Sequence, residues 1–85
     1  MTHPAKLTAY CDPRDNSLVI ERETGTVRQK IKTAIVLESA MLGKVFPCWH
    51  GPTNHSFRVR LFGTLQIVVD TRAAEIVTTT IGVKP

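Results

Sequence analysis

The chain has 85 residues, of which 42% are hydrophobic and 21% charged, a composition typical of one ordinary globular domain rather than a disordered segment. No apolar run approaches the roughly eighteen residues of a membrane span, and the first residues lack the apolar core of a secretion signal. The net charge of +4 favours polyanionic partners. We therefore expect a single cytoplasmic domain, residues 1–85, that binds no membrane.

Residues 1–16 are predicted to form an irregular N-terminal arm. The arm contains two prolines and the polar cluster Asp12–Asn16, which disfavour regular structure. At most a short extended piece is expected, over Leu7–Cys11.

Residues 17–23 fit two structures. A short helix could begin at Ser17 and end at Gly25, a natural C-terminal glycine. Alternatively, Leu18–Arg22 could pair with Leu7–Cys11 in a β-hairpin. We favour the helix.

The main helix is predicted over residues 26–42. Thr26-Val-Arg-Gln29 has the form of a capping box, and Gly43 follows the last apolar residue. Apolar residues then recur at helical spacing: Val27, Ile31, Ala34, Ile35, Met41 and Leu42. Three basic residues crowd the first turns, Arg28, Lys30 and Lys32, which is the unfavourable sign for the helix dipole.

The second half is predicted to be an antiparallel sheet of three to four strands. Lys44–Phe46 suits a short strand ended by Pro47. Residues 48–55 then form a loop. Three segments with alternating apolar residues follow it, at 57–61, 65–70 and 75–81, and each is predicted to be a strand. The order of elements predicts an α+β fold, in which the helix packs on the apolar face of the sheet.

The apolar pattern also predicts the register of these strands. With a loop of Phe62-Gly63-Thr64, Phe57 opposes Val69, Val59 opposes Ile67, and Leu61 opposes Leu65. A loop of Arg72-Ala73-Ala74 would pair Val69 with Val77 and Leu65 with Ile81. The opposite face would then be basic and rich in hydroxyls: Ser56, Arg58, Arg60, Gln66, Val68, Thr78 and Thr80.

One chemistry that fits this face is RNA cleavage by the neighbouring 2′-hydroxyl. His50 and His55 could transfer the protons, because histidine titrates near neutral pH. Arg58 and Arg60 could hold the phosphate, with Thr80 among the groups that orient it. These five residues are the candidate catalytic set.

A binding surface without catalysis is the second alternative. Trp49 and neighbouring aromatics beside the arginines could stack bases or anchor a protein. The candidate nucleic-acid-binding residues are Lys44, Trp49, Arg58, Arg60, Gln66 and Thr78. A metal site could combine Cys48, His50 and His55 with Cys11 or His3, but the spacing matches no usual ligand pattern. We expect no metal and no cofactor, and two buried thiols.

The segment from Leu65 to Thr78, two apolar strands joined by a short acidic turn, resembles the closing hairpin of the small RNase-toxin superfamily. That group unites barnase-like, EndoU-like, tRNA-cleaving colicin and RelE-type domains. The capped helix at 26–42 and the three later strands follow the same order. The resemblance implies helices followed by a sheet whose open face carries the active site.

The expected function is therefore that of a small basic RNA-directed toxin or RNase-like domain of a phage or plasmid system. The partners would be RNA and an antitoxin or host protein, with a homodimer through the edge strand 75–81 as a further possibility. The alternative is a non-enzymatic accessory protein that binds and blocks a host protein or a nucleic acid.

Overall fold

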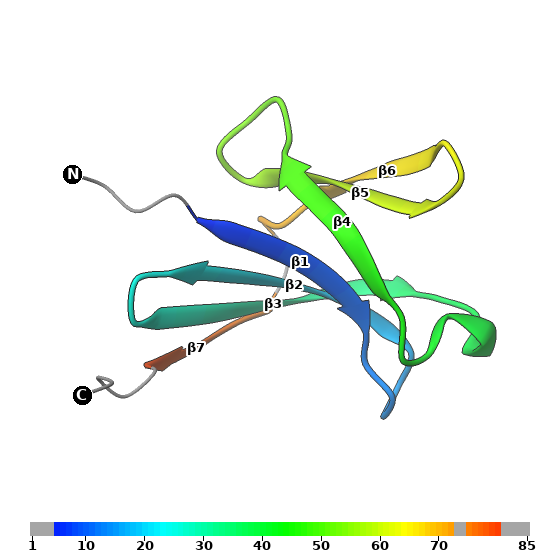
Figure 1. Cartoon of the computed structure of the whole chain (residues 1–85). Coiled ribbons are helices and arrows are strands. Elements are labelled where there is room, and N and C mark those ends of the chain that lie inside the picture. Colours follow the sequence, from blue (N-terminus) through cyan, green and yellow to red (C-terminus); the bar gives the residue numbers. More distant parts are fainter. Residues whose placement is uncertain (1–4, 73–74, 81–85) are drawn as a thin grey trace.

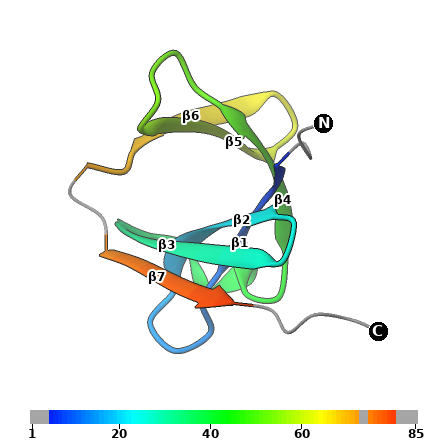
Figure 2. The ribbon, with the colours of Figure 1, turned by 90° about the vertical axis from the view of Figure 1, so that its left-hand side faces the viewer.

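The computed structural model describes residues 5–72 completely and residues 75–80 by their backbone. The described chain is mainly extended, and the one helical segment in it is the short 3-10 helix η1 (Ser39–Met41). The strands are β1 (Lys6–Cys11), β2 (Ser17–Thr24), β3 (Val27–Val36), β4 (Val45–His50), β5 (Ser56–Phe62), β6 (Leu65–Asp70) and β7 (Glu75–Thr80). They form one antiparallel sheet in the order β6-β5-β4-β1-β2-β3-β7, which curls until β5 and β6 lie across from β2 and β3 (Figures 1 and 2).

The predicted α+β fold, with a main helix over 26–42, is wrong. Residues 27–36 form strand β3 instead, paired with β2 from Thr24 and Val27 onward. Gly25 and Thr26 are a two-residue turn, and the positive φ of 58° at Gly25 suits a glycine in the first central position. Thr26 is therefore a turn residue and not a helix cap.

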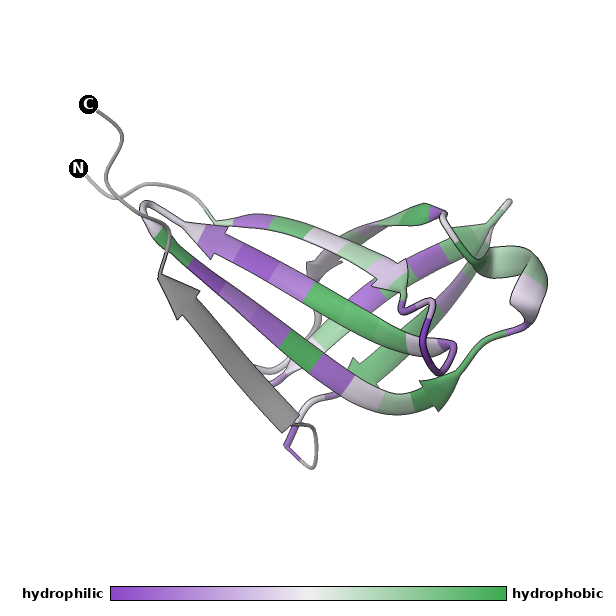
Figure 3. Cartoon of the chain, turned by 90° about the horizontal axis from the view of Figure 1, so that it is seen from below, coloured by the Kyte–Doolittle hydropathy of each residue, from purple (hydrophilic) through white to green (hydrophobic). Residues whose placement is uncertain are grey.

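Strand β3 has a period of two that the helical spacing concealed. Arg28, Lys30 and Lys32 share the outer face of the strand, away from the core. Ile31 and Thr33, which alternate with them, are buried on the inner face. The three cations that opposed a helix dipole thus belong to one side of a strand. Hydrophilic and hydrophobic residues alternate along the strands of the sheet (Figure 3).

For residues 17–23 the hairpin alternative is confirmed and the favoured helix is wrong. β1 pairs with β2 over its whole length, from Lys6 opposite Glu23 to Cys11 opposite Leu18. Residues 6–11 are therefore regular structure, in contrast to the irregular arm predicted over 1–16. In the turn, the Asp12 carboxylate accepts a hydrogen bond from the backbone N–H of Arg14 at 2.9 Å.

Strand β4 turns the corner between the two arms of the sheet. Its first half, Val45–Pro47, pairs with β1, and its second half, Cys48–His50, pairs with β5. Each half of β4 is thus paired along one edge. Because its other edge needs no ladder hydrogen bond, a proline, which has no N–H to donate, is tolerated within the strand. The strand consequently continues past Pro47 to His50, beyond the predicted end at Phe46.

The register predicted for β5 and β6 is confirmed at two of its three pairs. Phe57 opposes Val69 and Val59 opposes Ile67, as the apolar pattern indicates. The third pair differs, because a bulge at Leu61 shifts the register and lets Phe62 oppose Leu65. The turn is thereby two residues long, Gly63-Thr64, without exchanging the faces of the strands.

The predicted pairing of the strand at 75–81 with the strand at 65–70 is wrong. β7 pairs with β3, from Val27 opposite Thr80 to Lys32 opposite Glu75. β6 and β7 are consequently the two edges of the sheet. β6 and β7 therefore lie on opposite arms of the curled sheet and form no hairpin with one another (Figure 2).

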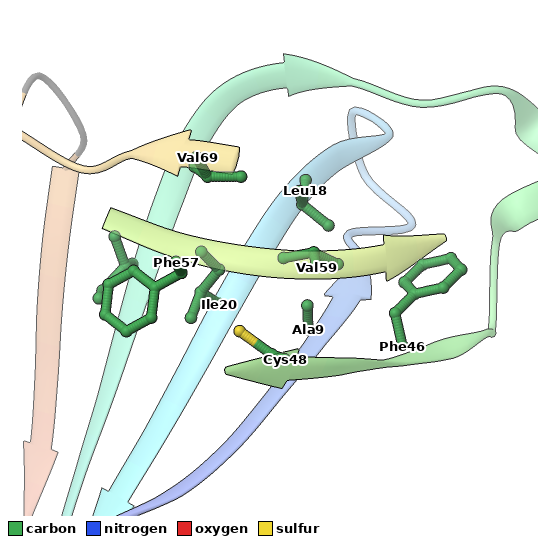
Figure 4. Close-up of a cluster of buried hydrophobic side chains, with 9 residues drawn as sticks. Ala9, Leu18, Ile20, Phe46, Cys48, Phe57, Val59 and Val69 are labelled. Carbon is green, nitrogen blue, oxygen red and sulfur yellow. The ribbon is translucent and has the colours of Figure 1, made fainter. Parts of the chain in front are cut away.

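The hydrophobic core fills the inside of the curl. Its side chains come from β1, β2 and β3 on one side and from β4, β5 and β6 on the other (Figure 4). Phe57 and Val59 of β5 are among the most deeply buried, at 1% and 0% exposure. The core members are Ala9, Leu18, Ile20, Ile31, Phe46, Cys48, Phe57, Val59 and Val69. Because alternate residues of each strand face this core, their neighbours are directed to the outer face.

Candidate nucleic-acid interface

The outer face of β4 and β5 carries one tryptophan and two arginines side by side. Trp49 opposes Arg58 in the β4–β5 pairing, and Arg60 is the next outward residue of β5. The alternation that buries Cys48, Val59 and Phe57 sends these three side chains outward. We call Trp49, Arg58 and Arg60 the tryptophan–arginine face.

Both guanidinium groups of this face lie at cation–π distance from the indole. The Arg60 guanidinium carbon is 5.1 Å from the centroid of the Trp49 ring, and that of Arg58 is 6.0 Å from it. Trp49 remains 37% exposed. The ring is thus held by its cationic neighbours and still open to a ligand.

Neither arginine of this face has a carboxylate partner among the described residues, a property that they share with Lys6, Arg22, Lys30 and Lys44. Among the described residues, carboxylate partners within 4.0 Å are found for Arg14, Arg28, Lys32 and Arg72. Arg28, for example, lies 3.3 Å from both Glu21 and Glu23 on the outer face of the other arm. Positive potential is therefore less compensated over β5 than over β3.

Polar and apolar side chains of β6 extend the tryptophan–arginine face. Gln66 opposes Arg60 and Val68 opposes Arg58, so both lie on the same outer surface. Val68 is 60% exposed. The predicted common face of Arg58, Arg60 and Gln66 is confirmed.

Three other predicted residues lie elsewhere in the fold. Thr78 and Thr80 belong to β7, opposite Gln29 and Val27 of β3, five places from β5 in the order of the sheet. Their predicted place beside the arginines is wrong, because β7 does not pair with β6. Lys44 stands in the exposed turn before β4, where its backbone N–H donates to the carbonyl of Met41.

The two histidines line different cavities. His50 ends β4, its ring 5.6 Å from that of Phe57, and it lines a cavity of about 300 Å³ with Gly51, Pro52 and Arg58. His55 precedes β5, and its carbonyl accepts hydrogen bonds from the N–H and hydroxyl of Thr71 at 2.8 and 2.7 Å. Of the predicted catalytic set, His50 and Arg58 share a cavity, whereas His55 and Thr80 are separate from it.

The cavity beside His55 is lined by an arginine, Arg22, that was not among the site residues predicted from the sequence. It measures about 280 Å³ and is lined by Arg22, Ile31, Asn54, His55, Phe57, Thr71 and Arg72. Arg22 follows Leu18 and Ile20 on the inner face of β2, at a spacing of two. That spacing would have revealed a charge on an apolar face if the segment had been interpreted as a strand.

Both cysteines are free and buried. Burial raises the pKa of the Cys48 thiol to about 11, and burial together with Asp12 and Asp15 raises the pKa of Cys11. Within residues 5–72, no group of three His, Cys, Asp or Glu side chains is placed to hold a metal ion. Cys48 belongs to the core cluster, so the metal alternative loses its central ligand.

Comparison of the chain with protein-family models, with curated proteins and with solved structures found no match. The helical segment of the described part of the chain, three residues long, is too short to cross a membrane.

Proposed function

We propose that this protein binds single-stranded nucleic acid on the tryptophan–arginine face, without cleaving it. The observation that carries the proposal is the exposed Trp49 ring with two guanidinium groups at 5.1 and 6.0 Å that lack carboxylate partners among the described residues. Surfaces that bind single strands combine stacking aromatic rings with cations that follow the phosphates.

Each group has a separate task in this binding. A base stacks on the open side of the Trp49 indole, which accepts any base because every base has a π-face. Arg58 and Arg60 donate paired N–H groups to the phosphates on either side of that base. Gln66, opposite Arg60 on β6, adds an amide that can donate to or accept from a base edge.

The curl of the sheet favours a single strand over a duplex. The exposed residues of this face lie on a sheet that curls (Figure 2), and within the described residues they present no helix to a major groove. A flexible strand can follow such a surface, and its unpaired bases are free to stack.

The proposal is tested with a fluorescent oligonucleotide of about 12 nucleotides, longer than one small site requires. Anisotropy measures the affinity for RNA and DNA versions of the same sequence, and the fluorescence of Trp49, the single tryptophan, reports stacking directly. Trp49→Ala should weaken binding roughly 5- to 150-fold, the effect of losing one stacked base. Trp49→Phe, which keeps a ring, should lose less.

Phe62→Ala is the matched control, because Phe62 is another exposed aromatic residue at the end of β5. It should change the affinity by no more than about twofold, since it lies outside the tryptophan–arginine face. Equal losses in Trp49→Ala and Phe62→Ala, or saturating binding with no change in Trp49 fluorescence, would refute the proposal.

The same samples test the ribonuclease expected from the sequence. Cleavage by the 2′-hydroxyl needs a base and an acid on either side of one phosphate. His50 and Arg58 share a cavity, while His55 lines another. Intact RNA after prolonged incubation agrees with the binding proposal, and specific cleavage that His50→Ala abolishes would replace it with an enzyme.

A further inference from the structure

The cavity between the two arms of the sheet has the composition of an anion site. Its lining includes two arginines, an asparagine, a histidine and a threonine, and no carboxylate among the described residues. The residues come from β2 and β3 on one arm and, on the other, from β5, the loop before it and the segment after β6. Figure 2 shows these arms facing one another.

Arg22 is the cation of this cavity that lies on the inner face of β2, where it is only partly exposed. Its guanidinium carbon lies 6.0 Å from the centroid of the Phe57 ring, and it donates to the side-chain oxygen of Gln29. No carboxylate of the described residues forms an ion pair with it. A partly desolvated cation with only neutral partners favours an incoming anion.

Some of the other polar side chains around the cavity already donate hydrogen bonds within the protein, and others do not. Arg72 already donates two side-chain N–H groups to the Asp70 carboxylate, and the Thr71 hydroxyl donates to the His55 carbonyl. The side chains of Asn54 and His55 have no hydrogen-bond partner among the described residues. Arg22, Asn54 and His55 are therefore the groups that a ligand would meet.

We propose that this cavity binds a small phosphate ester. The phosphate oxygens accept hydrogen bonds from Arg22 on one wall and from Asn54 and His55 on the other. Phe57 and Ile31, which line the same cavity, contact the organic part of the ligand. This site lies on the inner side of the sheet and does not depend on nucleic-acid binding at the tryptophan–arginine face.

A phosphate suits the arrangement better than a carboxylate does. Donors that approach from two arms of the sheet match the tetrahedral oxygens of a phosphate, whereas a planar carboxylate is satisfied by one guanidinium fork. The cavity volume of about 280 Å³ lies near the lower end of small-molecule pockets.

The test is a titration of the isotope-labelled protein with inorganic phosphate, uridine monophosphate and acetate at constant ionic strength, followed by NMR. Saturable shifts at Arg22, Asn54 and His55 are expected, with the monophosphate tighter than inorganic phosphate and acetate weakest. Arg22→Gln should weaken binding by at least about tenfold, since it removes a charged hydrogen-bond donor. Lys44→Gln, which removes a charge in the exposed turn before β4, should leave it unchanged.

Asn54→Ala keeps the test decisive if Arg22→Gln unfolds the chain, because Asn54 is exposed in a loop. It should weaken phosphate binding several-fold while the melting temperature stays the same. Shifts that do not saturate, or an equal response in wild type and Asn54→Ala, would overturn the proposal.

A terminal phosphate of a nucleic acid offers the same chemistry, and a second arm of the experiment separates it. In Arg58→Gln/Arg60→Gln protein, a short oligonucleotide with a 5′-phosphate is compared with its 5′-hydroxyl form. If uridine monophosphate shifts the Arg22 signals and neither oligonucleotide does, the ligand is a free phosphate ester. Equal shifts at Arg22 with both oligonucleotides would contradict a phosphate-specific site.

Discussion

Phe57 links the two arms of the curled sheet, so its truncation should be the most damaging single change in the core. The Phe57 side chain is 1% exposed, and the residue opposes Val69 of β6. Its ring lies near Arg22, which belongs to β2 on the opposite arm, and near His50 of β4. A buried phenylalanine removes about 150 to 250 Å² from water, which corresponds to roughly 4 to 6 kcal/mol before the remaining alanine is subtracted. Phe57→Ala should therefore cost about 3 to 5 kcal/mol.

That loss is a large share of the stability of an 85-residue domain, which we expect to be about 4 to 13 kcal/mol. Urea unfolding followed by far-UV circular dichroism and by Trp49 fluorescence measures it, with Phe62→Ala as the same substitution at an exposed end of β5. Phe62→Ala should cost no more than about 0.5 kcal/mol. Similar costs for both variants, or separate transitions for the two probes, would refute a single core shared by both arms.

Three further predictions concern the labelling of the thiols, the stability of the fold at low pH and the loop before β5. Because burial raises the pKa of Cys48 to about 11, only about one thiol in a thousand is ionised near pH 8, and labelling with a thiol reagent should be slow until a denaturant unfolds the chain; rapid labelling of the native protein would contradict its burial. Lys32 and Ser17 hold the pKa of Asp15 well below its usual 3.8, so the folded state binds fewer protons than the unfolded state, and this stabilisation is present above about pH 4 and lost as the pH falls; urea midpoints measured from pH 6 downward should fall less steeply in Asp15→Asn than in wild type. Gly51→Ala would press a methyl group against Ser56, which caps the loop before β5, and should cost about 1 to 3 kcal/mol; a thermal midpoint equal to that of wild type would show that the loop yields.

The β5–β6 hairpin could be predicted because its signal is local. Only one register puts Phe57 and Val59 opposite apolar partners, so the faces of Arg58 and Arg60 follow from the pattern itself. Even the bulge at Leu61 preserves this result. The predicted nucleic-acid-binding residues on that hairpin consequently share one surface.

The first half could not be predicted in the same way, because its pattern fits two periods. Val27, Ile31 and Ile35 recur every four residues, which satisfies both a helix and one face of a strand. What distinguishes them is the alternation of the cations and the glycine at position 25, which suits a tight hairpin turn.

Long-range pairing was beyond the reach of local patterns. β7 follows β6 along the chain and yet pairs with β3, which ends almost forty residues earlier. Nothing in the spacing of Val69 and Val77 distinguishes a hairpin from a crossing to the other edge. The cavity around Arg22 was missed for the same reason, because it exists only when the two arms face one another.

The most direct test of the central claim is the salt dependence of oligonucleotide binding in two charge-matched variants. Arg58→Gln/Arg60→Gln removes two cations from the tryptophan–arginine face, and Lys6→Gln/Lys30→Gln removes two from the other arm, where both residues also lack carboxylate partners among the described residues. Both variants lower the net charge from +4 to +2, the result of subtracting two positive charges.

If the two arginines hold phosphates, the slope of log affinity against log salt between about 50 and 200 mM should fall by about 1.4 in the arginine variant, at 0.7 for each phosphate contact with a single strand. The lysine variant should keep nearly the wild-type slope. Equal slopes in the two variants would mean that binding follows net charge alone, which would contradict a site at Trp49, Arg58 and Arg60.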